Sequence, residues 1–165
     1  MTLMAATFVL LGGLQLAPPQ LRPPSSLAQL VDEAAARFDV PAELVHAVIN
    51  KESGGQLTRD GTPITSSAGA MGIMQLMPAT WTSIRQELSL GPNPYNIRDN
   101  IMAGTFYLKR MGERFGYPGM LAAYNAGPRR YQQYLESSVR RNPSDFSRMR
   151  ASAWDSADSL YPREK

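Results

Sequence analysis

The stretch of sequence that decides the fold is Pro41-Ala42-Glu43-Leu44-Val45-His46-Ala47-Val48-Ile49-Asn50-Lys51-Glu52-Ser53-Gly54-Gly55. Proline is favoured in the first turn of a helix, where its missing N–H is not needed, and glycine is favoured just after the last turn. The segment is therefore predicted to be a helix. Its apolar residues recur at the spacing of one helical face and are Leu44, Val45, Val48 and Ile49. Glu52 continues that stripe in the last turn.

This position of Glu52 has a chemical consequence. Burial disfavours a carboxylate and raises the pKa of the group, and the negative end of the helix dipole acts in the same direction. A carboxyl group that stays protonated near neutral pH can act as a general acid. The alternative is that the helix frays at Lys51 and Glu52, so that the carboxylate points into water.

Composition excludes several kinds of chemistry. The chain has 165 residues, 43% of them hydrophobic, which is enough for one domain with a core. Its net charge of +3 is too small to indicate a nucleic-acid partner. There is no cysteine, which excludes disulfides and thiolate metal sites, and His46 is the single histidine, which excludes a two-histidine metal site. No metal or organic cofactor is implied, and the available groups are carboxylates, hydroxyls and amides.

The two ends of the chain differ from its middle. Residues 1–25 comprise an apolar stretch that is similar to the core of a signal peptide, followed by a proline-rich linker, and they predict export. No basic residue precedes the apolar run and no clear cleavage site follows it, so a misplaced start codon or an uncleaved membrane anchor is the alternative. Residues 137–165 are polar and are predicted to be a flexible tail, whose arginines either contact an anionic polymer or a partner protein or are simply solvated.

Between these ends, residues 26–136 predict a single all-α domain, because no strand pattern of any strength is present. Ser26 and Gln29 form a capping-box pattern before the first helix, and further helices are predicted to start at Pro78 and Pro118. Another covers Arg129 to Glu136. Asn96 caps the most regular helix, which ends at Gly116 and has the buried stripe Ile97, Ile101, Gly104, Leu108, Met111 and Phe115. We expect that helix to be a packing element without chemistry of its own, with Gly104 permitting a close helix crossing.

Three stretches together resemble the lytic transglycosylase domain, a member of the lysozyme-like superfamily related to goose-type lysozyme. They are the pair Glu52-Ser53, the Gly-x-Met-Gln-x-Met-Pro-x-Thr stretch from Gly72 to Thr80, and Ala-Tyr-Asn-Ala-Gly from Ala123 to Gly127. Asn100-Ile101-x-Ala103-Gly104 is also similar to the family's sequence before the tyrosine motif. The order and the separations of these stretches match the family over about two-thirds of the chain.

The resemblance implies a lysozyme-like helical domain with a substrate cleft that cleaves the β-1,4 bond between N-acetylmuramic acid and N-acetylglucosamine in peptidoglycan. The product expected of the family has a 1,6-anhydromuramic acid end. Glu52 matches the catalytic acid and Ser53 the serine that supports it. Met74 and Gln75 match the pair that lines the cleft, and Tyr124 and Asn125 match the pair that contacts substrate.

The residues themselves support this chemistry. Most glycosidases need two carboxylates, whereas here Asp60 is the only acidic residue near Glu52 in the sequence that is a candidate for the second. One acid is sufficient if the substrate supplies the attacking group. Glu52 would protonate the glycosidic oxygen, the 2-acetamido group would stabilise the oxocarbenium-like centre, and Glu52 would then take the proton of the C6 hydroxyl as the anhydro ring closes.

Two other functions are compatible with the sequence. The first is a hydrolytic muramidase on the same fold, with Asp60 as a helper. The second is a non-catalytic peptidoglycan-binding scaffold of an envelope machine, although a binding protein has no need of a buried acid. In each case the partner is the peptidoglycan glycan strand in the periplasm or cell envelope, together with a candidate partner protein of a secretion, conjugation, flagellar or phage apparatus. Contact with the membrane is expected only if the N-terminal segment is uncleaved.

Overall fold

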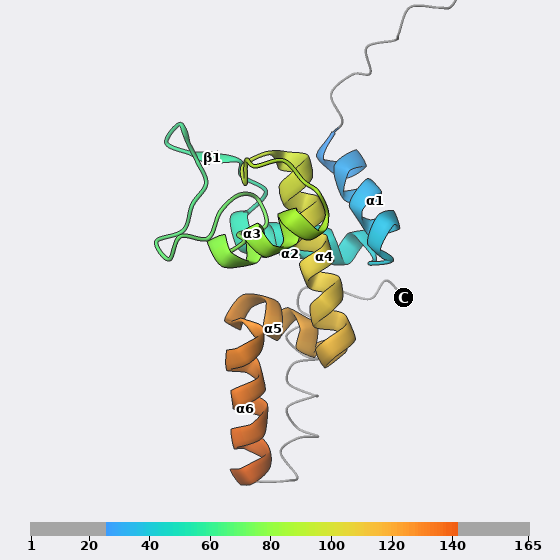
Figure 1. The fold of residues 1–165 in the computed structure, drawn as a ribbon, viewed down its shortest axis with the longest axis vertical. Helices are drawn as coiled ribbons and strands as arrows, with labels where there is room; N and C mark the ends of the chain where they lie inside the picture. Colours follow the sequence, from blue (N-terminus) through green and yellow to red (C-terminus); the bar gives the residue numbers. More distant parts are fainter. Residues whose placement is uncertain (1–25, 142–165) are drawn as a thin grey trace, which may run out of the picture.

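The computed structural model describes residues 26–141, which are mainly helical (Figure 1). The predicted signal-like segment and linker, and the tail from residue 142 onward, lie outside the described residues. The elements in chain order are α1 (Leu27–Phe38), α2 (Ala42–Ser53), β1 (Thr58–Arg59), β2 (Thr62–Pro63), α3 (Pro78–Glu87), α4 (Ile97–Phe115), α5 (Gly119–Ala126) and α6 (Pro128–Arg141). The predicted all-α class is therefore confirmed.

The predicted helix caps are present. Before α1, the Ser26 side chain accepts the Gln29 backbone N–H at 3.2 Å, and the Gln29 side chain accepts the Ser26 backbone N–H at 2.8 Å. Before α4, the Asn96 side chain accepts the backbone N–H of Asp99 at 3.0 Å. Gly54 ends α2 in the left-handed conformation, with φ of 63°. These contacts satisfy backbone groups that would otherwise lack partners at the helix ends.

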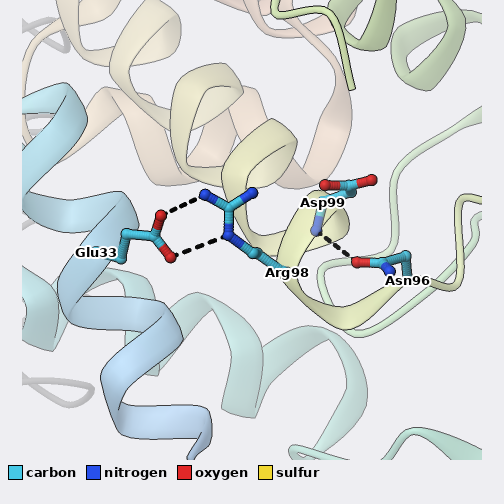
Figure 2. Close-up of polar contacts among 4 residues, drawn as sticks. All are labelled: Glu33, Asn96, Arg98 and Asp99. Atoms are coloured by element: carbon cyan, nitrogen blue, oxygen red, sulfur yellow. Dashed lines mark hydrogen bonds and ion pairs between the residues drawn. The ribbon is translucent and has the colours of Figure 1, made fainter. Parts of the chain in front are cut away.

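Helix α4 lies at the centre of the fold and contacts α1, α3 and α5 (Figure 1). Its predicted stripe is largely buried, and the fully buried apolar residues of this helix are Ile101, Met102, Ala103 and Leu108. At its first turn Arg98 forms a two-pronged ion pair with Glu33, which ties α4 to α1 (Figure 2). Both side chains are about half exposed, so the pair contributes little energy beyond fixing the contact.

Three sequence expectations need correction. A short hairpin, β1 pairing with β2, was not predicted, although its Asp60-Gly61 turn has φ of 53° and 76°, as a tight hairpin turn requires. Helix α6 continues to Arg141 rather than ending at Glu136. Gly104 does not admit another helix: a Cβ at this position would lie 2.3 Å from the Met74 sulfur atom, so the glycine makes room for a loop side chain.

Helix α6 packs against α5 and otherwise projects away from the other helices (Figure 1). The start of α6 also contacts the end of α4, where the rings of Phe115 and Tyr131 meet edge to face with centroids 5.1 Å apart. Helices α5 and α6 thus form one end of the fold, beyond α4. Within residues 26–141, no helix is both long enough and apolar enough to cross a membrane.

Candidate active site

Glu52 is the next-to-last residue of α2 and is partly buried, as its place on the apolar stripe predicts. Burial raises the pKa of its carboxyl group above the ordinary value, and hydrogen bonding to the Asn125 side chain and the charge of Lys51 partly oppose that shift. The direction of the predicted pKa shift is confirmed. A proton on Glu52 therefore persists to higher pH than on an exposed glutamate.

Tyr124 and Asn125 are brought to this carboxyl group by the last turns of α5. The buried Tyr124 hydroxyl donates to the Met74 backbone carbonyl oxygen at 2.9 Å. Burial, followed by the negative charge of Glu52, holds the pKa of Tyr124 well above its usual value, so this phenol stays protonated. The hydrogen bond fixes the ring of Tyr124, while Asn125 remains exposed beside Glu52.

The segment from Met71 to Met77 forms a tight loop whose shape depends on two unusual residues. Gln75 has φ of 51°, and its side chain donates to the Gly72 carbonyl oxygen at 2.8 Å. Gly72 lies so close to Asn100 of α4 that a Cβ would be 2.3 Å from the Asn100 amide nitrogen. The loop is thereby pressed against α4, with its backbone next to the Asn100 side chain.

Asn100 holds this loop from beneath and is only 1% exposed. Its amide oxygen accepts the backbone N–H of Met74 at 2.8 Å, and its amide nitrogen donates to the carbonyl oxygens of Met71 at 3.1 Å and Pro94 at 2.8 Å. Because Met74 in turn accepts the Tyr124 hydroxyl, a continuous set of hydrogen bonds joins α4, the loop and α5.

These elements enclose a cavity of about 800 Å³, within the range of small-molecule sites. Glu52 is the only carboxylate on its wall among the residues described. The rest of the wall is polar, apolar, aromatic or basic: Ser66, Ala68, Ala70, Gln75, Leu76, Met77, Thr80, Tyr107, Tyr124, Asn125, Ala126, Gly127, Pro128, Arg129 and Arg130.

The structure brings four of the six predicted site residues to this cavity, namely Glu52, Gln75, Tyr124 and Asn125. Met74 is instead fully buried beneath the loop, where its side chain packs against Gly104. Ser53 is also buried and donates to the Ile49 carbonyl oxygen of its own helix at 3.1 Å. Neither Met74 nor Ser53 lines the cavity, because both side chains point into the interior of the fold. Met74 lies next to Gln75 in the chain, and Ser53 lies next to Glu52.

Sequence reasoning missed other residues of the wall. Tyr107 of α4 packs against Tyr124 with ring centroids 5.1 Å apart, so α4 contributes to the cavity after all. Its place one turn from both Gly104 and Met111 is a signal that it borders the buried stripe. Asp60, the candidate second carboxylate, lines a separate pocket with Arg59, Thr62, Pro63, Thr65 and Tyr95.

Comparison with known proteins gives a consistent result. The family model described as the transglycosylase SLT domain matches residues 29–147. A transglycosylase of Enterobacteria phage PRD1 is 34% identical over 100 residues, covering 60% of this chain and 34% of the phage protein. The soluble lytic murein transglycosylase of Escherichia coli K12 is 33% identical over 110 residues, covering 62% of this chain and 16% of that protein.

Solved structures agree with the sequence relatives. The 70 kDa soluble lytic transglycosylase of Escherichia coli superposes with a TM-score of 0.58 and 30% identity, over 67% of this chain and 18% of that one. An inactive glutamate-to-glutamine mutant of lytic transglycosylase Slt from Pseudomonas aeruginosa superposes with a TM-score of 0.57 and 27% identity, over 64% of this chain and 17% of that one. The chain therefore spans about a third of the phage relative and less than a fifth of the bacterial ones.

Proposed function

The chain belongs to the transglycosylase SLT domain family, and from that premise we propose that it is a lytic murein transglycosylase. The substrate is the glycan strand of peptidoglycan. The bond that breaks is the β-1,4 link between N-acetylmuramic acid and N-acetylglucosamine, and the product carries a 1,6-anhydromuramic acid end. No water enters the reaction.

One observation carries this proposal: a partly buried glutamate of raised pKa is the only carboxylate on the wall of the cavity, within the part of the chain described. An inverting or retaining hydrolase of the usual kind places a second carboxylate across the scissile bond. Asp60, the nearest candidate in the sequence, lines a different pocket. A reaction in which the substrate supplies its own nucleophile needs only Glu52.

The proposed reaction has two steps, and Glu52 takes part in both. In the first, Glu52 gives its proton to the glycosidic oxygen as the bond from that oxygen to C1 of the muramic acid breaks, and the 2-acetamido group stabilises the positive charge that develops at C1. In the second, the C6 oxygen attacks C1 and its proton passes to the Glu52 carboxylate. The acid is thereby regenerated, and every proton is accounted for.

We assign supporting roles to the neighbouring residues. Asn125 and Gln75 offer amides to the N-acetyl groups of the sugar, and Tyr124 offers the edge of a ring whose hydroxyl is already engaged by Met74. Ser53 and Met74 act from beneath the surface, through the end of α2 and through the loop. Ser53 and Met74 are thus proposed to position the site, not to contact the sugar.

We also propose where the enzyme acts. An apolar, signal-like N-terminal sequence and a peptidoglycan substrate together favour export to the periplasm or cell envelope. There the domain, which we place at residues 26–136, would open or remodel the wall locally, in the service of an envelope machine.

Mass spectrometry of muropeptides released from purified sacculi tests the function. We expect anhydromuropeptides from the wild type and from the matched control Asp60→Asn, and none from Glu52→Gln. Reducing-end products would instead establish the hydrolytic muramidase. Binding of sacculi by wild type and Glu52→Gln alike, with no soluble product from either, would contradict enzymatic function and favour the scaffold.

A further inference from the structure

The cavity has an uneven distribution of charge. Besides Glu52, its only charged wall residues within the described range are Arg129 and Arg130, in the first turn of α6. The remainder of the wall is neutral. Two positive charges therefore lie side by side in sequence on the wall of the cavity that also contains the proposed acid, and the proposed mechanism gives them no task.

Both arginines lack an acidic partner in the part of the chain described. The ion pairs found there join other residues: Glu33 with Arg98, Glu113 with Lys109, and Glu87 with Arg110. Arg129 and Arg130 are exposed and form none of them. An unpaired guanidinium group presents a planar set of donors that fits a carboxylate with two parallel hydrogen bonds.

The shift in the pKa of Glu52 has other causes: burial raises it, and the Asn125 hydrogen bond and the charge of Lys51 oppose it. The position of Arg129 and Arg130 on the cavity wall suits them to hold a separate, negatively charged part of a ligand while Glu52 acts on an uncharged bond.

We propose that Arg129 and Arg130 form a subsite that binds a carboxylate carried by the muramic acid of the substrate, an inference that rests on the proposed function. The N-acetylated sugar backbone of peptidoglycan is uncharged. Its negative charges lie on the lactyl side group of muramic acid, where that group is free, or on the peptide attached to it. The pair thus makes the cavity selective for muramic acid substituents over a plain N-acetylglucosamine polymer.

Binding is measured with the non-cleaving variant Glu52→Gln as the parent, by titration calorimetry against three short glycan strands. The first carries peptides, the second carries free lactyl carboxylates, and the third has its lactyl carboxylates converted to neutral methylamides. To this parent we add Arg129→Gln together with Arg130→Gln. The matched control adds Arg85→Gln with Arg114→Gln, which removes the same charge from residues that do not line the cavity.

The Arg129→Gln/Arg130→Gln double variant should bind a carboxylate-bearing strand about tenfold more weakly, since each exposed charge pair makes only a modest contribution. Binding of the methylamide strand should not change, and neither should any binding by the control. A loss confined to the peptide strand would place the carboxylate on the peptide, and a loss confined to the lactyl strand would place it on the lactyl group. A loss on both strands would show that the two arginines accept either carboxylate. Equal weakening for all three strands, or for none, would overturn the subsite.

Two further readouts separate this inference from the proposed function. Anhydromuropeptide release by the wild type tests the function alone. If the wild type is active and the double arginine variant binds every strand like its Glu52→Gln parent, only the subsite is refuted. If the protein binds none of the strands and releases no product, the proposed function and the subsite are both refuted. In the cleaving background, the double variant should release less product from the carboxylate-bearing strands at low substrate concentration than the Arg85→Gln/Arg114→Gln control, and equal release would count against the subsite.

Discussion

Replacement of Asn100 by alanine is the most direct test of how the candidate site is held together. The side chain is 1% exposed and bonds to three backbone groups from two segments. It supports the loop that carries Gln75 and that accepts the Tyr124 hydroxyl. The substitution removes this support without touching the proposed acid.

The cost can be worked out bond by bond. The Met71 carbonyl oxygen keeps a partner, because it also accepts the Leu76 N–H at 3.0 Å. The Met74 N–H and the Pro94 carbonyl oxygen lose the Asn100 bonds of 2.8 Å each. The buried Met74 N–H without a partner costs about 1–3 kcal/mol, and the half-buried Pro94 carbonyl oxygen costs less because water can reach it, so we expect a loss of about 2–4 kcal/mol in the free energy of unfolding. That is a large part of the roughly 5–15 kcal/mol that stabilises a typical domain.

Urea denaturation of the full chain measures this loss, with an unchanged dependence on urea as the sign of a comparable unfolded state. Asn96→Ala is the matched control, because it removes a single exposed capping bond of 3.0 Å and should cost about 1 kcal/mol. An Asn100→Ala variant no less stable than Asn96→Ala would refute the argument that Asn100 holds the loop against α4.

Other predictions concern Glu52 and the packing of the loop. Hydrogen bonding to Asn125 lowers the pKa of Glu52, so Asn125→Ala should move the alkaline limb of the pH dependence of kcat/KM to higher pH; a shift to lower pH would contradict the assignment. A raised folded-state pKa means that stability is lost as pH rises through it, so Glu52→Gln should gain stability relative to wild type between pH 4 and pH 7 in urea titrations at both values. Gly104→Ala would place a Cβ 2.3 Å from the Met74 sulfur and 2.7 Å from the Met74 Cβ, and should cost about 1–3 kcal/mol. The control Gly112→Ala, whose nearest contact is 3.2 Å, should cost less or even stabilise the helix; equal losses in urea would show that the loop yields easily.

The helices were predictable because their signals are local. A capping box needs only Ser26 and Gln29, and the α4 stripe needs only a period of one helical turn. The position of Glu52 followed in the same way, from its spacing after Val48 and Ile49. The hairpin strands were not predicted because each has only two residues, too few to show an alternation of polar and apolar side chains. The Asp60-Gly61 turn was nevertheless visible in the sequence.

The assembly of the site was less predictable because it depends on contacts between distant segments. Nothing local to Met74 shows that its side chain fills the space left by Gly104 while its carbonyl oxygen meets Tyr124, fifty positions further along the chain. Tyr107 was missed for a related reason. It borders the α4 stripe, and only the packing of α5 shows that its ring meets Tyr124 at the cavity wall.

The proposed chemistry requires Glu52 to be protonated in one step and deprotonated in the next, and the site contains groups that favour each form. A group that first gives a proton and then accepts one must be accessible in both forms during a single turnover. Burial favours the protonated form, whereas hydrogen bonding to Asn125 and the charge of Lys51 favour the carboxylate. Deeper burial without Asn125 would hinder loss of the proton in the first step. Full exposure would leave Glu52 deprotonated before the substrate binds. A pKa raised by burial but restrained by Asn125 is therefore what a single-carboxylate mechanism requires.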